Sequence, residues 1–189
     1  MARGHDQKEK ILDAAFEVFG KNGYYDTKML DIAGLAGVSK GTLYLYFPSK
    51  ESLYIEVHDR SFNHYLSQLE QKVNGFSTFK EKLVCIAEEN LMVFYKDRDK
   101  PNKYLQAYTN DPNMIKSLHT FFDNYHKYVT SLMQEEGIRD PAVHAKAFIG
   151  MLNNYQRDIF FDPAFDYSAL LGAAVFVVDL FVGGCRRNE

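Results

Sequence analysis

Cysteine is scarce in this chain of 189 residues, and tryptophan is absent. The two cysteines, Cys85 and Cys185, lie far apart, and the charged first ten residues, MARGHDQKEK, contain no apolar core. We therefore expect no signal peptide, and two free thiols in a reducing cytoplasm rather than a disulfide framework. A buried structural role is the usual one for such cysteines, and a redox switch is the alternative.

Sequence motifs of catalysis are also missing. The chain has no nucleophile elbow, no glycine-rich phosphate loop and no zinc signature. It also shows no strand-like alternation, internal repeat or low-complexity tract, so the predicted fold is all-α. We therefore expect a protein that is not an enzyme and needs no cofactor or metal.

Aromatic residues, in contrast, are abundant, with 15 Phe and 13 Tyr in a chain that is 46% hydrophobic and 25% charged. These proportions are typical of a globular protein, and the aromatic residues can fill a core, line a pocket or form a subunit interface. The formal net charge of −3 does not favour a nucleic-acid partner by itself. Locally, however, the stretch 40–50 contains two lysines and no acidic residue.

Helical periodicity covers most of the chain. Caps are predicted at Asp6 (with Glu9 as its capping-box partner), Thr27, Ser39 and Ser49, and glycine ends are predicted at Gly23 and Gly37. The predicted helices span 6–23, 27–37, 39–47, 50–73, 78–96, 104–108, 114–135, 141 to about 160, and 167 to about 186. The helix over 50–73 is long enough to link two parts of the protein.

The stretch Leu30–Lys50 has the pattern of a helix-turn-helix. A short helix ends at Gly37, and Ser39 can cap a second helix whose buried side carries Leu43 and Tyr46. The outward side is small and polar, with Lys40, Gly41, Thr42 and Tyr44. Such a face suits entry into a DNA major groove.

Many positions between Lys8 and Leu53 share one family pattern at fixed spacing. They are Ile11, Leu12, Ala14, Ala15, Phe19, Gly23, Thr27, Ile32, Ala33, Ala36, Gly37, Val38, Ser39, Gly41, Leu43, Tyr44, Tyr46, Phe47, Lys50, Glu51 and Leu53. On these residues, the first quarter of the chain resembles the DNA-binding domain of the TetR family of bacterial transcription regulators. The remainder matches only in length and helical character.

The resemblance implies a three-helix DNA-binding domain over 1–49 and a helical ligand-binding and dimerisation domain over 50–189, with 50–74 as the connecting helix. Thr42, with Lys40 beside it, is the candidate base reader, and Gly41 allows close approach of the backbone. The candidate phosphate contacts are Thr27, Ser39, Tyr44, Tyr46 and Lys50. For the two tyrosines, core packing is the alternative, more so for Tyr46.

Aromatic residues recur along the predicted helix 114–135 and near it. They are Tyr104, Tyr108, Phe121, Phe122, Tyr125, Tyr128 and Tyr155. They fit either plain core or the wall of a ligand cavity, with Asn153, Asn154, Glu88 or Glu89 as polar contacts. His119, Asp123 and His126 share one helical face, which fits a metal site but more commonly is a solvated surface.

The last apolar run, SALLGAAVFVVDLFVGG, contains Asp179 and follows Asp166. Because its uncharged length is below the ~20 residues that a bilayer requires, we expect no membrane span. The resemblance implies a two-fold interface made from the last two long helices, and burial within one monomer is the alternative.

Taken together, the sequence predicts a cytoplasmic homodimer that binds a near-palindromic operator and responds to a small-molecule effector, most simply as a repressor. The alternative is a DNA-binding protein of the same fold that is controlled by a protein partner.

Overall fold

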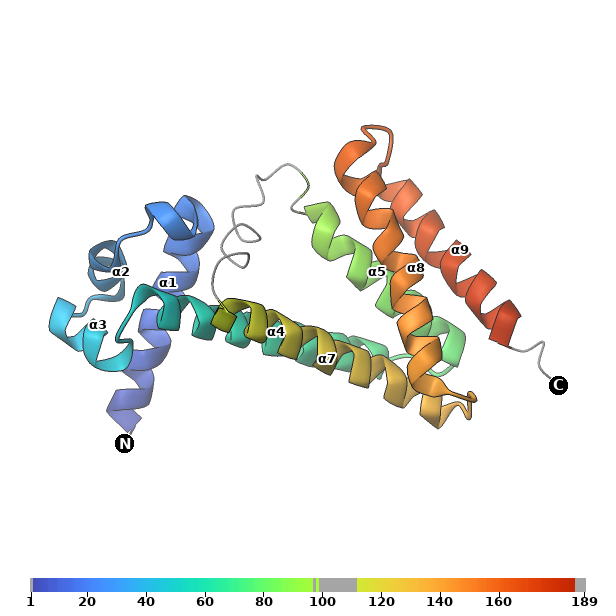
Figure 1. Ribbon diagram of the computed structural model, residues 1–189, viewed down its shortest axis with the longest axis horizontal. Coiled ribbons are helices and arrows are strands. Elements are labelled where there is room, and N and C mark those ends of the chain that lie inside the picture. The colour runs from blue at the N-terminus through green and yellow to red at the C-terminus, as the bar shows by residue number, and fades with distance from the viewer. Residues whose placement is uncertain (1, 97, 99–111, 186–189) are drawn as a thin grey trace. The chain divides into compact units, whose positions relative to one another are not determined.

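The computed structural model describes residues 2–96, 98 and 112–185, and within these ranges the chain consists of helices joined by turns (Figure 1). The helices are α1 (Ala2–Asp26), α2 (Met29–Ala36), α3 (Lys40–Tyr46), α4 (Lys50–Val73), α5 (Phe79–Lys96), α7 (Pro112–Glu135), α8 (Pro141–Phe161) and α9 (Tyr167–Cys185). The prediction of an all-α fold is therefore confirmed. The predicted helix 104–108 lies outside the described residues.

The described residues form two compact units. The head unit takes its residues from Met1–His64 and Asn102–Phe121, and the body unit from Tyr65–Pro101 and Phe122–Glu189. The division falls inside α4 and inside α7, so each of these helices contributes residues to both units. The sequence places the boundary earlier, before Lys50, because the packing of Leu53 and Tyr54 in the head core is not visible in a linear pattern.

The core of the head unit is aromatic and aliphatic. Phe19 of α1, Leu43 of α3 and Tyr54 of α4 are fully buried, and the Phe19 ring lies 4.8 Å from the Tyr54 ring in an edge arrangement. Burial of side chains of this size contributes roughly 1.5–3 kcal/mol each, so these contacts hold the short helices α2 and α3 in place. Leu118 of α7 also packs against this core.

Two of the predicted helix ends in the head unit are wrong. Asp6 does not cap α1, because the helix already begins at Ala2; instead its carboxylate accepts a hydrogen bond from Lys10 Nζ at 2.8 Å. Thr27 does not cap α2, since the capping position is Lys28 and the Thr27 hydroxyl donates to the carbonyl of Gly23 at 2.6 Å. Charge and hydroxyl patterns alone cannot distinguish a cap from such local pairing.

Other predicted ends are confirmed. Helix α1 is interrupted at Gly23, whose φ of 75° and ψ of 173° belong to a region almost reserved for glycine. Ser49 accepts a hydrogen bond from the backbone of Ser52 at 3.1 Å at the start of α4. Thr78 and Glu81 form a reciprocal capping box at the start of α5.

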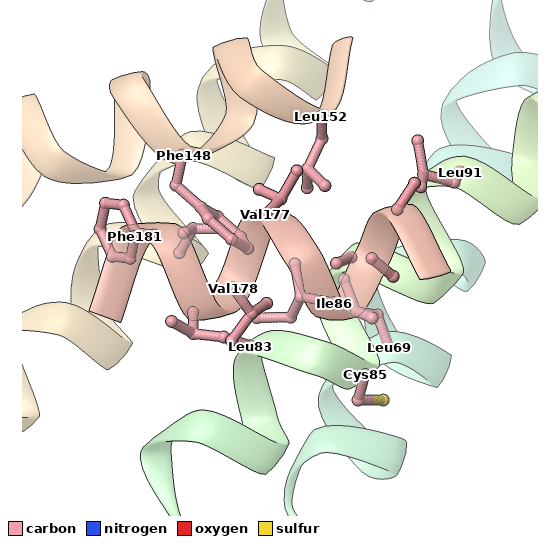
Figure 2. Close-up of a cluster of buried hydrophobic side chains, with 14 of the residues drawn as sticks. Leu69, Leu83, Cys85, Ile86, Leu91, Phe148, Leu152, Val177, Val178 and Phe181 are labelled. Carbon is pink, nitrogen blue, oxygen red and sulfur yellow. The ribbon is translucent and has the colours of Figure 1, made fainter. Parts of the chain in front are cut away.

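The body unit is built around α5, which packs against α8 and α9 (Figure 1). Figure 2 shows the interior of this core, where Leu83 and Ile86 of α5 lie against Val178 of α9. The Phe148 ring of α8 lies 5.2 Å from the Phe181 ring. Among the described residues, α4 and α7 also contribute buried side chains to this core.

Cys85 belongs to this core and is a free, buried thiol. Burial and the neighbouring Glu89 raise the pKa of the thiol, so it stays protonated near neutral pH. Since the thiolate is the reactive form, the environment favours the structural role over a redox switch.

Helix α9 contains an 18-residue stretch, Tyr167–Gly184, that is long and apolar enough to cross a membrane by length and composition. A third of this stretch (33%) is buried inside the chain. Asp179 lies within it and forms an ion pair with Lys80 of α5 at 2.6 Å. A paired charge on the surface of the body unit favours a helix packed on protein over one in lipid.

Candidate nucleic-acid interface

A tight turn joins α2 to α3. Gly37 adopts the left-handed conformation (φ 67°, ψ 30°) predicted for it, and the Val38 amide donates to the carbonyl of Ala33 at 3.0 Å. Ser39 then caps α3, its hydroxyl accepting a hydrogen bond from the Thr42 amide at 3.0 Å. The turn and cap fix the direction in which α3 leaves α2.

The outer face of α3 is open, as the sequence predicts. Lys40 and Gly41 are exposed, and Thr42 is half-buried with its hydroxyl 2.8 Å from that of Ser39. Tyr44 is 41% exposed, and Lys40 Nζ lies 5.8 Å from the centre of its ring. The structure therefore brings Ser39, Lys40 and Thr42 together on one small polar surface.

Gly41 has no packing role inside the protein. A Cβ added there would meet only Ser39 Oγ, at 3.8 Å, which is an ordinary contact. The fold would thus accept a larger residue at this position. The missing side chain would therefore matter to a molecule that approaches α3 from outside, such as a DNA duplex lying close to the helix backbone.

Tyr46 lies at the edge of the same helix and is only partly exposed. Its hydroxyl donates to the Gln7 side chain of α1 at 3.3 Å, and its ring packs against the head core. The ring therefore serves the core, while its hydroxyl remains at the surface. The packing role of Tyr46 is therefore present, and a phosphate contact of its hydroxyl stays a prediction.

Lys50 and Thr27, the other two predicted phosphate contacts, are turned toward the protein. Lys50 Nζ donates to the backbone carbonyls of Tyr24, Tyr25 and Thr27 at 2.9, 3.3 and 3.1 Å, and it lies 4.6 Å from the centre of the Tyr24 ring. Thr27 itself is only 2% exposed. The ammonium group has three protons, and these three carbonyls use them all.

Glu51 follows Lys50 and is held by the same corner of the head unit. Its carboxylate accepts a hydrogen bond from the Tyr24 hydroxyl at 2.8 Å. Hydrogen bonds from the backbone amide of Glu51 and from Tyr24 lower the pKa of this carboxyl group, so it remains ionised. Lys50, Glu51 and Tyr24 thus join the first turn of α4 to the end of α1.

The described aromatic residues among those predicted for a ligand site are divided between the two units. The Phe121 ring stacks on Phe62 within the head unit, with centroids 4.3 Å apart, while Phe122 is exposed in the body unit. Tyr125 is buried and accepts a hydrogen bond from Asn90 at 3.2 Å; burial raises its pKa. Tyr104 and Tyr108 lie outside the described residues.

Tyr128 and Tyr155, the remaining two, pack against the core of the body unit. Burial, followed by the nearby Glu70, raises the pKa of Tyr128 to about 12, so its hydroxyl stays protonated. The Tyr155 ring lies 6.4 Å from that of Phe165. For Tyr125, Tyr128 and Tyr155 the packing is therefore that of a core.

An open groove of about 790 Å³ lies elsewhere in the body unit, along the end of α4 and the outer side of α5. It is lined by Lys72, Phe76, Thr78, Lys80, Glu81, Val84, Cys85, Glu88 and Glu89. Burial and Glu89 raise the pKa of Glu88, and Lys72 pairs with Glu89 at 2.5 Å. The two predicted polar contacts Glu88 and Glu89 are thus on this groove.

The histidine face of α7 shows the features of a solvated surface. His119 and Asp123 are exposed, and His126 Nε2 lies 3.0 Å from the carbonyl of Ala142. Among the described residues, no group of three or more His, Cys, Asp or Glu side chains is arranged to hold a metal ion.

A three-helix head whose second and third helices meet at a glycine turn, with the third helix open on its outer face, defines a helix-turn-helix DNA-binding protein. Residues 11–57 match the family described as bacterial regulatory proteins of the tetR family. Among curated relatives, the fatty acid metabolism regulator protein of Bacillus subtilis (strain 168) is 33% identical over 90 residues, 48% of this chain and 46% of that protein.

Solved structures extend the similarity of fold beyond the head. A regulator from Mesorhizobium loti, assigned to the TetR family, superposes with a TM-score of 0.81 at 21% identity, covering 96% of this chain and 98% of its own. The regulator FadR of Bacillus subtilis, in complex with stearoyl-CoA, superposes with a TM-score of 0.66 at 23% identity, covering 93% and 98%. The chain belongs to the TetR family of transcriptional regulators.

The aligned segment spans about half the length of the curated relative, and the structural similarities, both below 25% identity, concern the fold alone. Membership of a family of transcription regulators agrees with the prediction that the chain is not an enzyme.

One exposed residue of α3, Leu45, is not among the residues that the sequence pattern indicates. Its position opposite the buried Leu43 on a helical wheel is a signal that would have found it.

Proposed function

We propose that the chain is a ligand-responsive transcriptional repressor that binds a near-palindromic operator as a homodimer in the cytoplasm. The observation that carries this proposal is the outer face of α3, which is open, free of acidic residues and held rigidly by Gly37 and Ser39. A rigid helix with a small polar face can enter a major groove with little loss of conformational entropy.

On this proposal, Thr42 and Lys40 read base edges and Gly41 allows the backbone to approach. Ser39, Tyr44 and Tyr46 hold phosphates at the rim of the groove. For Lys50 and Thr27 we propose a different part from the one that the sequence suggests. Their hydrogen bonds to backbone carbonyls hold the end of α1 near the start of α4. They would affect DNA binding through the shape of the head unit.

Dimerisation is supported by the apolar surface of α9. Phe176 and Leu180 are 59% and 57% exposed, although they belong to the most apolar of the described helices. Contiguous apolar surface of this kind is costly in water and marks interaction sites. A two-fold arrangement would bury it against the same surface of a second copy and would present two α3 helices to one duplex.

Regulation would act on the spacing of the two heads. Half-sites one helical turn apart are separated by about 34 Å, so a change of a few ångströms removes one set of contacts. Helix α4 runs continuously from the head unit into the body unit, and an effector that favours one setting of it would change DNA affinity. The coupling available to such a ligand is typically about 1–3 kcal/mol.

A second candidate keeps the DNA binding and replaces the small molecule with a protein partner. The packing of Tyr125, Tyr128 and Tyr155 as core favours it. The groove of about 790 Å³ along α5 favours the small molecule. Native mass spectrometry of the freshly purified chain distinguishes them: a retained low-mass ligand supports the first candidate, and retention of none, with no thermal shift by stearoyl-CoA, supports the second.

The DNA-binding part is tested by selection of duplexes from a random pool with the purified full chain. We expect a near-palindromic site with half-site centres 10–10.5 base pairs, or a multiple of that spacing, apart. Thr42→Ala should relax the preference at one position of each half-site by about 1 kcal/mol, while its affinity for other positions is kept. Enrichment of no sequence by the unmodified chain would contradict the proposal.

A further inference from the structure

Leu45 is the exposed aliphatic residue of α3. Its side chain is 83% exposed, and it takes no part in the core of the head unit. Single exposed leucines are ordinary on a protein surface and need no explanation by themselves. This one matters because of where it stands on the helix that is proposed to enter the groove.

The helical repeat places Leu45 on the outermost line of α3. Leu43 is fully buried and marks the inner side of the helix. Each residue turns about 100° around the axis, so Gly41 and Leu45, two residues before and after Leu43, both lie about 160–200° from it. They are four residues apart and therefore stand one above the other on the face farthest from the core.

Gly41 carries no side chain, and the space around it is open. On the outermost line of α3, Leu45 is therefore the side chain that projects farthest from the head unit. Tyr44 and Thr42 lie to either side of this line. A duplex that approaches α3 would meet the Leu45 methyl groups at the level of the base edges.

Leucine has no hydrogen-bond donor or acceptor, so it cannot hold a phosphate or read a polar base edge. The apolar group that a major groove offers is the C5-methyl of thymine. Resting on the proposed DNA binding, we propose that Leu45 determines specificity by packing on a thymine methyl group at one position of each half-site. Thr42 and Lys40 then read the polar edges, and Leu45 distinguishes thymine from the other pyrimidine.

The test compares thymine with deoxyuridine, which lacks only the methyl group. Each thymine of the selected operator is replaced in turn, and affinity is measured for the unmodified chain, Leu45→Ala and the control Leu35→Ala, which truncates an exposed leucine of α2. For the unmodified chain and the control, one replacement per half-site should weaken binding about fourfold, the equivalent of one buried methyl group. For Leu45→Ala the same replacement should have almost no effect.

Because Leu45 is exposed, its truncation should leave the unfolding midpoint unchanged, and circular dichroism checks this. A methyl effect of equal size in the unmodified chain and in Leu45→Ala would overturn the assignment of Leu45 while leaving the DNA binding intact. A half-site in which no thymine methyl matters would overturn it equally. Failure of the unmodified chain to bind any duplex would overturn the proposed function and this inference together.

Discussion

A lysine next to a recognition helix is easily interpreted as a phosphate contact, yet the Lys50 ammonium binds the chain's own backbone. Two of its carbonyl partners belong to the end of α1 and the third, that of Thr27, follows α1, just after Gly23 interrupts the helix and leaves backbone groups without helical partners. The lysine satisfies those groups. A hydrogen bond to a charged group contributes roughly 1.5–3 kcal/mol, so the structural role is substantial.

Lys50 and Lys40 should therefore respond differently to truncation. We expect Lys50→Ala to lower the free energy of unfolding by about 1.5–3 kcal/mol, measured by urea denaturation followed by circular dichroism. Lys40→Ala, which removes an exposed side chain, should leave stability nearly unchanged but weaken operator binding by about 1–3 kcal/mol. Unchanged stability in Lys50→Ala would contradict the structural role of this lysine.

His58 of α4 gives the head unit a dependence on pH. Its ring lies 4.2 Å from that of Tyr54, and burial lowers its pKa from the ordinary 6.5 to about 4. The folded chain keeps the ring neutral, whereas the unfolded chain takes up a proton below pH 6.5. Stability is therefore fully present above pH 6.5 and is lost as the pH falls toward 4.

Between pH 6.5 and 5.5 the loss attributable to His58 should be about 1 kcal/mol. His58→Leu should remove this part of the slope, whatever its effect on stability at pH 7.5. His64→Leu, which replaces an exposed histidine of the same helix, should retain it. Urea denaturation at several pH values measures the slopes; equal slopes in both variants would show that His58 is not the responsible group.

At the scale of elements, the head unit includes the first part of α7 as well as α1 to α4. The Ser117 hydroxyl of α7 donates to the Asp59 carboxylate of α4, and Ser117 is itself buried. Phe121 stacks on Phe62 one turn further along both helices. A buried hydrogen bond and a ring stack thus hold α7 on the segment of α4 that belongs to the head unit.

Loss of the hydroxyl should weaken this attachment. We expect Ser117→Ala to lower the free energy of unfolding by about 1–3 kcal/mol, because it removes a charge-assisted hydrogen bond from a buried site. Thr120→Ala is the matched control, since that exposed hydroxyl donates only to a carbonyl of its own helix. Hydrogen exchange of the α4 amides measures the effect; equal protection in both variants would show that the bond contributes nothing.

For the molecule as a whole, the decisive surface is the one that α9 leaves exposed. Leu180→Arg places a charge in the apolar surface that we propose for the homodimer. Because an unpaired charge in such an interface costs several kcal/mol, we expect the variant to sediment as a monomer and to lose most of its operator affinity. Phe16→Arg, the same kind of change on α1, should leave the sedimentation coefficient unchanged.

An unmodified chain that sediments as a monomer would contradict the two-fold arrangement. Such a monomer would recognise single half-sites, and the selected duplexes would lack palindromic symmetry. Sedimentation and duplex selection therefore test the dimer independently.

The amino-acid sequence by itself determined what depends on short-range chemistry. The all-α fold, the end of α2 at Gly37, the Ser39 cap and the start of α4 at Lys50 follow from periodicity and local hydrogen bonding, and all are present. The family resemblance likewise depends on residues close together in the chain. These features need no knowledge of which helices meet.

Only the tertiary structure decided which predicted side chains face outward. Thr27 and Lys50 match the family pattern, but both use their polar atoms internally, Thr27 on the nearby Gly23 carbonyl and Lys50 on carbonyls more than twenty residues away. Tyr125 and Phe121, four residues apart, belong to different units, and the boundary inside α4 reflects contacts with α1 and α3. Burial is set by long-range packing, and no local pattern in a sequence records which helix will cover a given face.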